Sequence, residues 1–250
     1  MSALRTEWDD PVLRVTLARP ERRNAFDATL IRELTEAFAD VGGARAVVLA
    51  GEGPSFCAGA DVEWQRGSIE LTYEENVEDA RHLYGMLATI DHCPAPVVAR
   101  VQGFALGGGS GLVACADVAI AAADAVFGFS EVKLGIVPAV ISPFVLPRIE
   151  AAARRYFLTG ERFDAQAALR IGLVSEVAAD LDAAVERVVG ELVAAGPNAT
   201  RAAKRLIREG PRGTATVELA ARLRTSDEGQ EGLRAFLERR DPAWRFSSSS

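Results

Sequence analysis

The sequence predicts a mixed α/β protein whose layered core occupies the first half of the chain. Short apolar runs typical of buried strands alternate with amphipathic helical segments up to about residue 130. Beyond about residue 150, every periodic segment is helical. The composition, with 49% hydrophobic and 25% charged residues, is that of an ordinary globular protein with one large core.

The first half is expected to contain five strands and three helices. The runs VLRVTL and AVVLA have the apolar content of strands. The first helix begins at the N-capping Asp27 and carries Leu30, Leu34 and Phe38 on one face. Strands are predicted at residues 12–17, 46–50, 97–101, 118–121 and 126–129, and helices at 27–40, at 74–90 and from the glycine run at 107–109 through 112–116.

The second half is expected to be a series of short helices. Such a series after an α/β core commonly packs onto a neighbouring subunit or caps its own core. The predicted helices cover residues 150–158, 164–171, 180–195, 197–209, 215–223 and 227–239. The four serines at 247–250 offer no packing side chain, which predicts a disordered tail.

The charge balance argues against a nucleic-acid-binding protein. The net charge is −7 and the sequence pI is about 5.1, whereas nucleic-acid-binding domains usually present a basic face. Arg22 and Arg23 form a small basic spot that could meet a phosphate. On charge alone, a solvated surface pair is the simpler interpretation.

The apolar and cysteine content favours a cytoplasmic protein without a metal. No apolar run is long enough to span a bilayer, and the first residues lack the apolar stretch of a signal peptide. The three cysteines, Cys57, Cys93 and Cys115, are odd in number and show no metal-ligand spacing. We therefore expect reduced cysteines that serve in packing, no membrane contact and no metal.

Two glycine-rich segments could direct backbone N–H groups at a ligand. Gly107, Gly108 and Gly109 lie between a predicted strand and a predicted helix, where free N–H groups and the helix dipole favour negative charge. The segment FCAGAD at 56–61 follows a strand and could free a second donor at Ala60. Two donors that point at one oxygen form an oxyanion hole. Each segment taken alone is also compatible with an ordinary tight turn.

Glu131 is the candidate acid or base. It lies among apolar residues, and a carboxyl group in such surroundings keeps its proton to higher pH. The alternative is a surface glutamate that pairs with Lys133 or a nearby arginine. The sequence around Glu131 leaves both interpretations open.

Five longer segments together carry a family resemblance. They are ARPERRNAFD at 18–27, FCAGAD at 56–61, PAPVVARVQGFALGGGSG at 94–111, ADVAIAAADAVFGFSEVKLGIVP at 116–138 and ARRYFLTGERFDAQAALRIGLVSEV at 153–177. In these segments, which cover most of the chain, the sequence resembles the crotonase (enoyl-CoA hydratase/isomerase) superfamily. The resemblance implies a spiral of repeated ββα units with a C-terminal helical region. It divides the chain into a core with the CoA and acyl site at 1–195, trimerisation helices at 196–246 and a tail at 247–250.

The resemblance also implies the ligand and the roles of individual residues. The substrate would be an acyl-CoA thioester, with no separate cofactor because CoA is part of the substrate, and the assembly a homotrimer or homohexamer. The backbone N–H groups of Ala60 and Gly108 would bind the thioester oxygen, and Glu131 would be catalytic. Substrate or CoA contacts would come from Arg22, Arg23, Ala25, Ala58, Asp61, Gly107, Gly111 and Pro138.

One position departs from the family pattern. Typical hydratases of the family carry a first glutamate where this chain has Gly111, so Glu131 is the only family acid/base present. Family isomerases also use one glutamate, which favours a Δ3,Δ2-enoyl-CoA isomerase. The segments at 60–81, 107–121, 130–149 and 231–244 instead resemble the bacterial methylglutaconyl-CoA hydratase branch, in which glycine is also expected at this position. The leading expectation is therefore a hydratase of a branched or dicarboxylic 2-enoyl-CoA, and a non-catalytic acyl-CoA-binding protein is the third candidate.

Overall fold

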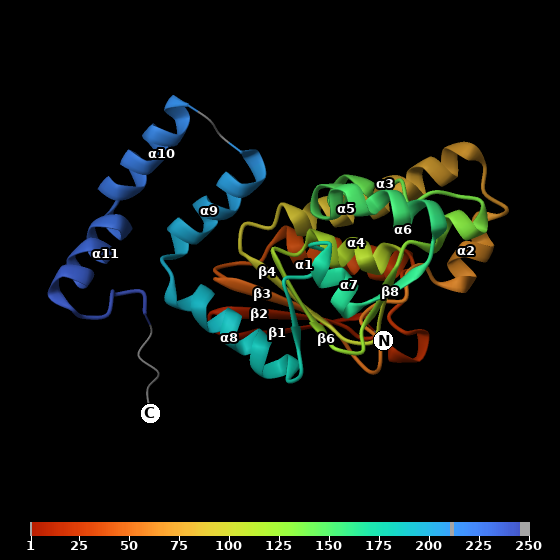
Figure 1. The fold of residues 1–250 in the computed structure, drawn as a ribbon, viewed down its shortest axis with the longest axis horizontal. Coiled ribbons are helices and arrows are strands. Elements are labelled where there is room, and N and C mark those ends of the chain that lie inside the picture. The colour runs from red at the N-terminus through yellow and green to blue at the C-terminus, as the bar shows by residue number, and fades with distance from the viewer. Residues whose placement is uncertain (1, 211–212, 246–250) are drawn as a thin grey trace.

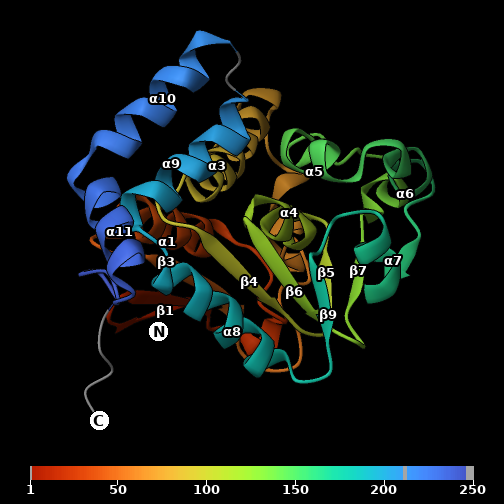
Figure 2. The same ribbon diagram turned by 60° about the vertical axis from the view of Figure 1, so that its left-hand side comes forward.

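A computed structural model describes residues 2–210 and 213–245. The predicted tail at 247–250 lies outside these residues. Two β-sheets form the centre, and helices cover both faces of the larger sheet (Figures 1 and 2). Within the described residues, none of the helices combines the length and the apolar character needed to cross a bilayer.

The larger sheet has six strands in the order β1-β2-β3-β4-β6-β9. The β1–β2 pair is antiparallel and all other neighbours are parallel. The central strands are buried on both faces, as parallel strands covered by helices usually are. Their bounds are β1 Leu4–Asp9, β2 Val12–Leu17, β3 Ala46–Gly51, β4 Val97–Val101, β6 Val118–Ala122 and β9 Glu176–Ala178.

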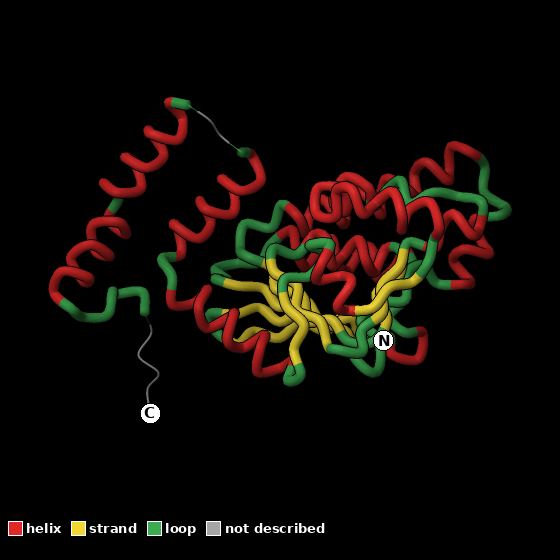
Figure 3. Tube along the Cα trace, in the orientation of Figure 1, coloured by secondary structure: helices red, strands yellow, loops and turns green. Residues whose placement is uncertain are grey.

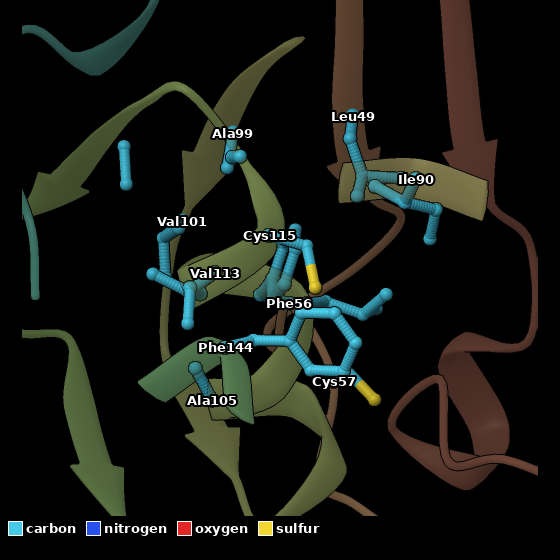
Figure 4. Packing of buried hydrophobic residues seen from close by; sticks show 14 of the residues in the cluster. Leu49, Phe56, Cys57, Ile90, Ala99, Val101, Ala105, Val113, Cys115 and Phe144 are labelled. Carbon is cyan, nitrogen blue, oxygen red and sulfur yellow. The ribbon is translucent and has the colours of Figure 1, made fainter. Parts of the chain in front are cut away.

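Alternate residues of these strands feed two separate cores. Val47 and Leu49 of β3 belong to the main core, which lies under α1, α3 and α4, whereas Val48 faces the opposite side. There it meets Val98 and the apolar face of α8. This alternation is the period of two expected of a strand. In Figure 4, the Cys57 and Cys115 sulfurs lie among apolar side chains.

All three cysteines are free and buried, which confirms their predicted packing role. Burial raises the pKa of the Cys57 thiol to about 12, so this group stays protonated and unreactive near neutral pH.

A smaller sheet of three strands runs in the order β5-β7-β8. The strands are β5 Phe104–Leu106, β7 Val126–Gly128 and β8 Arg162–Asp164. The central turns of the spiral each add one strand to the larger sheet, one to the smaller sheet, and then a helix. The turns β4-β5-α4 and β6-β7-α5 follow this order, and an isolated bridge from Cys57 to Ala105 extends it to the segment after β3. The predicted repeat of ββα units is thereby confirmed.

Helices connect the strands and make up most of the chain after β7 (Figure 3). The α-helices are α1 Ala28–Ala39, α2 Val62–Ser68, α3 Tyr73–Asp91, α4 Gly108–Cys115, α5 Ser142–Ile149, α6 Ala153–Thr159, α7 Ala165–Arg170, α8 Leu181–Ala194, α9 Pro197–Glu209, α10 Thr214–Thr225 and α11 Asp227–Glu238. The 3-10 helices are η1 Pro20–Arg22, η2 Ser130–Leu134 and η3 Glu150–Ala152.

Several elements escaped the sequence prediction. The edge strand β1 is exposed after Leu4 and therefore lacks an apolar run. The strands β5, β8 and β9 have three residues each, too few to show a period. Helix α5 holds prolines at its start and in its interior, and α2 has no buried residue. The other predicted elements are present within a few residues of their expected bounds.

The last helices extend away from the two sheets (Figure 1). Helix α9 contacts the core through Lys204. Its Nζ forms an ion pair with Asp117 Oδ2 at 2.6 Å and donates a hydrogen bond to the Ala95 carbonyl. Helix α11 leaves Phe236 and Leu237 about 80% exposed. The expected division of the chain at 195/196 falls in the turn between α8 and α9, and stays a prediction.

Candidate active site

A pocket of about 400 Å³ opens where the loop after β3, the start of α4 and η2 meet. Its lining includes Ala58 and Ala60 from that loop, Gly107 and Gly108 from the start of α4, and Glu131 from η2. Apolar side chains line most of the remainder. They include Trp64, Leu83, Ile136, Val137, Val140 and Ile141.

Two free backbone donors border the pocket. Gly108 is the first residue of α4, so its N–H has no acceptor inside the helix. Ala60 lies between Gly59 and Asp61, which are both bonded to Phe26, and its own N–H is directed away from that pairing. Within the described parts of the chain, no acceptor is found for either N–H.

Close packing of the two donor loops explains the small residues. A Cβ on Gly109 would lie 2.2 Å from the Cys57 carbonyl oxygen, and a Cβ on Gly59 2.9 Å from the Leu106 carbonyl oxygen. Gly107 has φ of +52°, a conformation that glycine adopts without strain. Glycine at these places therefore lets the Ala60 and Gly108 donors face one pocket.

Glu131 supplies a carboxylate beside these donors. Glu131 is the second residue of η2, and a Cβ on Gly107 would lie 3.1 Å from its Oε1. Oε2 is buried and lacks a hydrogen-bond partner. Burial raises the pKa of Glu131 above its usual range, although a hydrogen bond from its own backbone opposes the shift. Among the residues the structure describes, neither Glu131 nor Lys133 forms an ion pair, so the surface-pair alternative is wrong.

The segment that precedes α1 lies against the Ala60 loop. Arg22 Nη1 donates to Asp61 Oδ2 at 2.9 Å, and Asp61 also caps α2. Burial alone would raise the pKa of Asp61, but the hydrogen bonds from Arg22 and the Glu63 N–H outweigh it and hold the pKa below its usual range. The Arg23 guanidinium stacks over Phe104 at 5.7 Å.

The space beside Gly111 is occupied by a side chain from another part of the chain. A Cβ there would lie 2.7 Å from Ile141 Cγ2 and 3.2 Å from Ile141 Cβ. Ile141 is 2% exposed and also lines the pocket. The isoleucine that immediately precedes α5 thus fills the space next to Gly111.

The structure brings together part of the predicted site. Six of the predicted residues line the pocket, namely Ala58, Ala60, Gly107, Gly108, Glu131 and Pro138. The other five, Arg22, Arg23, Ala25, Asp61 and Gly111, are not part of the lining, and the buried Ala25 accepts through its carbonyl from Arg19.

Sequence reasoning missed Trp64, Leu83, Ile141 and Arg162, which also line the pocket. No motif marks these four residues, because they come from separate helices and strands that meet only in the fold.

This arrangement can stabilise negative charge on one oxygen and move one proton nearby. Two free N–H groups suit the oxygen of an enolate, which forms when a thioester loses a proton at Cα or when a nucleophile adds to C3 of an enoyl thioester. A buried carboxyl group with a raised pKa suits the proton transfer itself. The fold and site therefore define the class of enzyme in which two backbone N–H groups stabilise an oxyanion while a carboxyl group transfers a proton.

Comparison with known proteins gives the family. The family model described as enoyl-CoA hydratase/isomerase matches residues 7–246. A crystal structure of an enoyl-CoA hydratase from Shewanella pealeana is 40% identical, covers 97% of this chain and 96% of its own, and has a TM-score of 0.92. The structure of Pseudomonas aeruginosa AtuE is also 40% identical, covers 98% of this chain and 100% of its own, and has a TM-score of 0.92.

A further relative, the (E)-benzylidenesuccinyl-CoA hydratase of Thauera aromatica, is 32% identical over 96% of this chain and 97% of its own length. The chain belongs to the enoyl-CoA hydratase/isomerase family and is an enzyme of that family, as the crotonase resemblance predicted.

Proposed function

We propose that the protein hydrates a branched or dicarboxylic 2-enoyl-CoA with Glu131 as its single acid/base. The observation that carries this proposal is the Glu131 carboxylate, whose buried Oε2 has no hydrogen-bond partner, in the same pocket as the free N–H groups of Ala60 and Gly108. In this reaction Glu131 takes a proton from water while the water oxygen forms a bond to C3 of the substrate. The electrons of the double bond move to the thioester oxygen, which the two donors hold. Glu131 then returns the proton to C2, so one water is added and the carboxylate is restored.

The pocket lining supports the branched chain. Leu83, Val140 and Ile141 present apolar surface to the acyl group, which suits methyl branches. A dicarboxylic chain needs a cation for its second carboxylate. Arg162 is the only cation among the described residues that line the pocket, and its guanidinium stacks on Phe104 at 5.5 Å. Within the described residues, no carboxylate pairs with Arg162, which leaves it available for a substrate carboxylate.

A specific observation favours the Δ3,Δ2-enoyl-CoA isomerase as the second candidate. Ile141 makes the wall next to Gly111 apolar, so no side chain there holds a water. An isomerase needs no water, because one carboxylate moves a proton from C2 to C4.

Turnover of an acyl-CoA panel, read by mass, tests both candidates. The panel holds crotonyl-CoA, 3-methylglutaconyl-CoA and a 3-enoyl-CoA. Each is given to wild type, to Glu131→Gln and to the control Glu70→Gln, which changes an exposed glutamate. A gain of one water that requires Glu131 and survives Glu70→Gln supports the hydratase. A shifted double bond without a mass change supports the isomerase, and no reaction with any substrate refutes both.

Arg162→Gln separates the two acyl classes. Selective loss of activity on 3-methylglutaconyl-CoA, with crotonyl-CoA unaffected, indicates recognition of the second carboxylate. If Arg162→Gln changes the activity on both substrates by the same factor, the result argues for a branched chain without that carboxylate.

We also propose a homotrimer or homohexamer that works in the cytoplasm without nucleic acid or membrane. The exposed apolar side chains on the extended last helices, Phe236 and Leu237, support subunit contacts through this region. Light scattering of wild type and of Phe236→Asp tests the assembly. A mass of three or six chains that falls in the variant is expected, and a monomeric wild type contradicts it.

A further inference from the structure

The segment before α1 holds two successive residues in a left-handed conformation. Arg23 has φ of +51° and Asn24 has φ of +54°. Residues other than glycine adopt this region at a cost in conformational energy, and they persist there when neighbouring contacts hold them. Asparagine tolerates the conformation better than most residues. The backbone here is therefore held by something outside the segment.

The Asn24 side chain provides that hold. It is fully buried, and its Oδ1 accepts from the Arg19 N–H at 2.9 Å. Its Nδ2 donates to the carbonyls of Glu52 at 2.9 Å and Ser55 at 2.8 Å. A Cβ on Gly51 would lie 2.8 Å from Nδ2, so the neighbouring strand end leaves room for this amide. The amide ties the segment before α1 to the loop that follows β3.

That same loop continues into the oxyanion donor. From residue 58 to residue 61 it pairs with the segment before α1 in the manner of two strands. Because the residues on either side of Ala60 are bonded to Phe26, this pairing turns the Ala60 N–H toward the pocket. The bonds are Ala58 N–H to Arg23 O at 3.0 Å, Phe26 N–H to Gly59 O at 2.7 Å and Asp61 N–H to Phe26 O at 2.8 Å.

We infer that Asn24 is a positioning residue, which fixes the direction of the Ala60 N–H through the paired segments at 22–26 and 58–61. The amide acts at one end of this pairing, and the ion pair between Arg22 and the buried Asp61 acts at the other. Asn24 itself is absent from the pocket lining. The inference rests on the proposed oxyanion hole and adds the residue that holds one of its donors.

The test compares Asn24→Gly with wild type. Glycine accepts the left-handed conformation without strain and removes all three side-chain hydrogen bonds. The carbonyl stretch of a bound enoyl thioester is measured by infrared difference spectroscopy in the Glu131→Gln background, where turnover is blocked. We expect a smaller red shift of this band in Asn24→Gly. With Glu131 intact, we expect kcat to fall by about 10- to 100-fold and KM to change by less than about threefold, because loss of one oxyanion donor costs roughly 10²–10³ in kcat.

Matched variants keep the result from reflecting stability alone. Val189→Ala, on the buried face of α8 in the second core, lowers stability far from the site and is expected to leave the red shift and kcat unchanged. Asn24→Asp keeps the side-chain shape and the Arg19 bond but loses the donors when ionised. It is expected to reduce both readouts, and it replaces Asn24→Gly as the test variant if that protein does not fold.

Three outcomes overturn the inference. An unchanged red shift and kcat in Asn24→Gly show that Asn24 does not position the donor, and leave the proposed function standing. If the Glu131→Gln protein with Asn24 intact shows no red shift, the pocket has no oxyanion hole, and both the inference and the proposed function fail. An equal fall of kcat in Val189→Ala at equal loss of stability also overturns the inference.

Discussion

The contact between Gly111 and Ile141 predicts a strong energetic coupling between these positions. In Gly111→Ala the new Cβ would lie 2.7 Å from Ile141 Cγ2, whereas carbon atoms in good contact are about 3.5–4.0 Å apart. Ile141 must therefore move by roughly 1 Å, and overpacking of this kind costs about 1–3 kcal/mol. Alanine returns about 0.5–1 kcal/mol through its better helix propensity. The net expectation is a loss of about 1–2 kcal/mol.

Truncation of Ile141 to alanine is expected to reverse the sign of the change in unfolding free energy caused by Gly111→Ala. Ile141→Ala alone should cost about 2–5 kcal/mol, because the residue is almost fully buried. In that background the 2.7 Å clash with Cγ2 is gone and only the Cβ of residue 141, 3.2 Å away, must shift by a few tenths of an ångström, so Gly111→Ala should stabilise the protein by up to about 0.5 kcal/mol. The two effects at position 111 differ by about 2 kcal/mol, which is the predicted coupling energy of the cycle.

Urea unfolding followed by circular dichroism, at one protein concentration, measures the four free energies. Gly190→Ala in α8 is the control, since a Cβ there meets no atom within 4 Å. It should stabilise both backgrounds equally. A coupling energy below about 0.5 kcal/mol between positions 111 and 141 would refute the packing argument.

Three further predictions concern Gly108, Glu131 and Lys204. Gly108→Ala places a Cβ 2.7 Å from Phe26 Cε2, so the Gly108 donor must shift, and kcat should fall by about 100-fold in steady-state assays; unchanged kcat contradicts this. Burial raises the pKa of Glu131 above its ordinary value of 4.5. The folded protein therefore loses stability as pH rises from 4.5 through the folded-state pKa of Glu131, because the buried carboxyl group must ionise. Glu131→Gln should therefore unfold at higher urea than wild type at pH 8 but not at pH 4, and an equal difference at both pH values speaks against it. Lys204→Met leaves Asp117 without its buried partner and should cost roughly 3 kcal/mol in urea unfolding; the control Lys133→Met, at a residue without an ion pair among those described, should cost far less.

The sequence predicts the elements whose pattern is long enough to show a period. Helix α1 illustrates this, since its buried residues recur at helical spacing behind the Asp27 cap. The strand β8 does not, because its three residues become a strand only when β7 lies beside them. Long-range pairing of this kind leaves no local signal.

The candidate site divides in the same way. Glu131 and the glycine run carry a local signal, because a carboxyl group among apolar residues and a flexible strand-to-helix turn are visible in the sequence. Ile141 and Arg162 carry none, and they reach the pocket through separate elements that approach it in space. Asn24 shows its role only once its three backbone partners are known.

The closeness of the Glu131 carboxylate to Gly107, next to the Gly108 donor, has an electrostatic consequence. In the proposed reaction, one negative charge leaves the carboxylate as another arrives on the thioester oxygen a short distance away, and later returns. The pocket thus shifts a charge locally without changing its total. Surrounding solvent has little to reorganise at any step, so a small apolar enclosure can serve a reaction that passes through an anion.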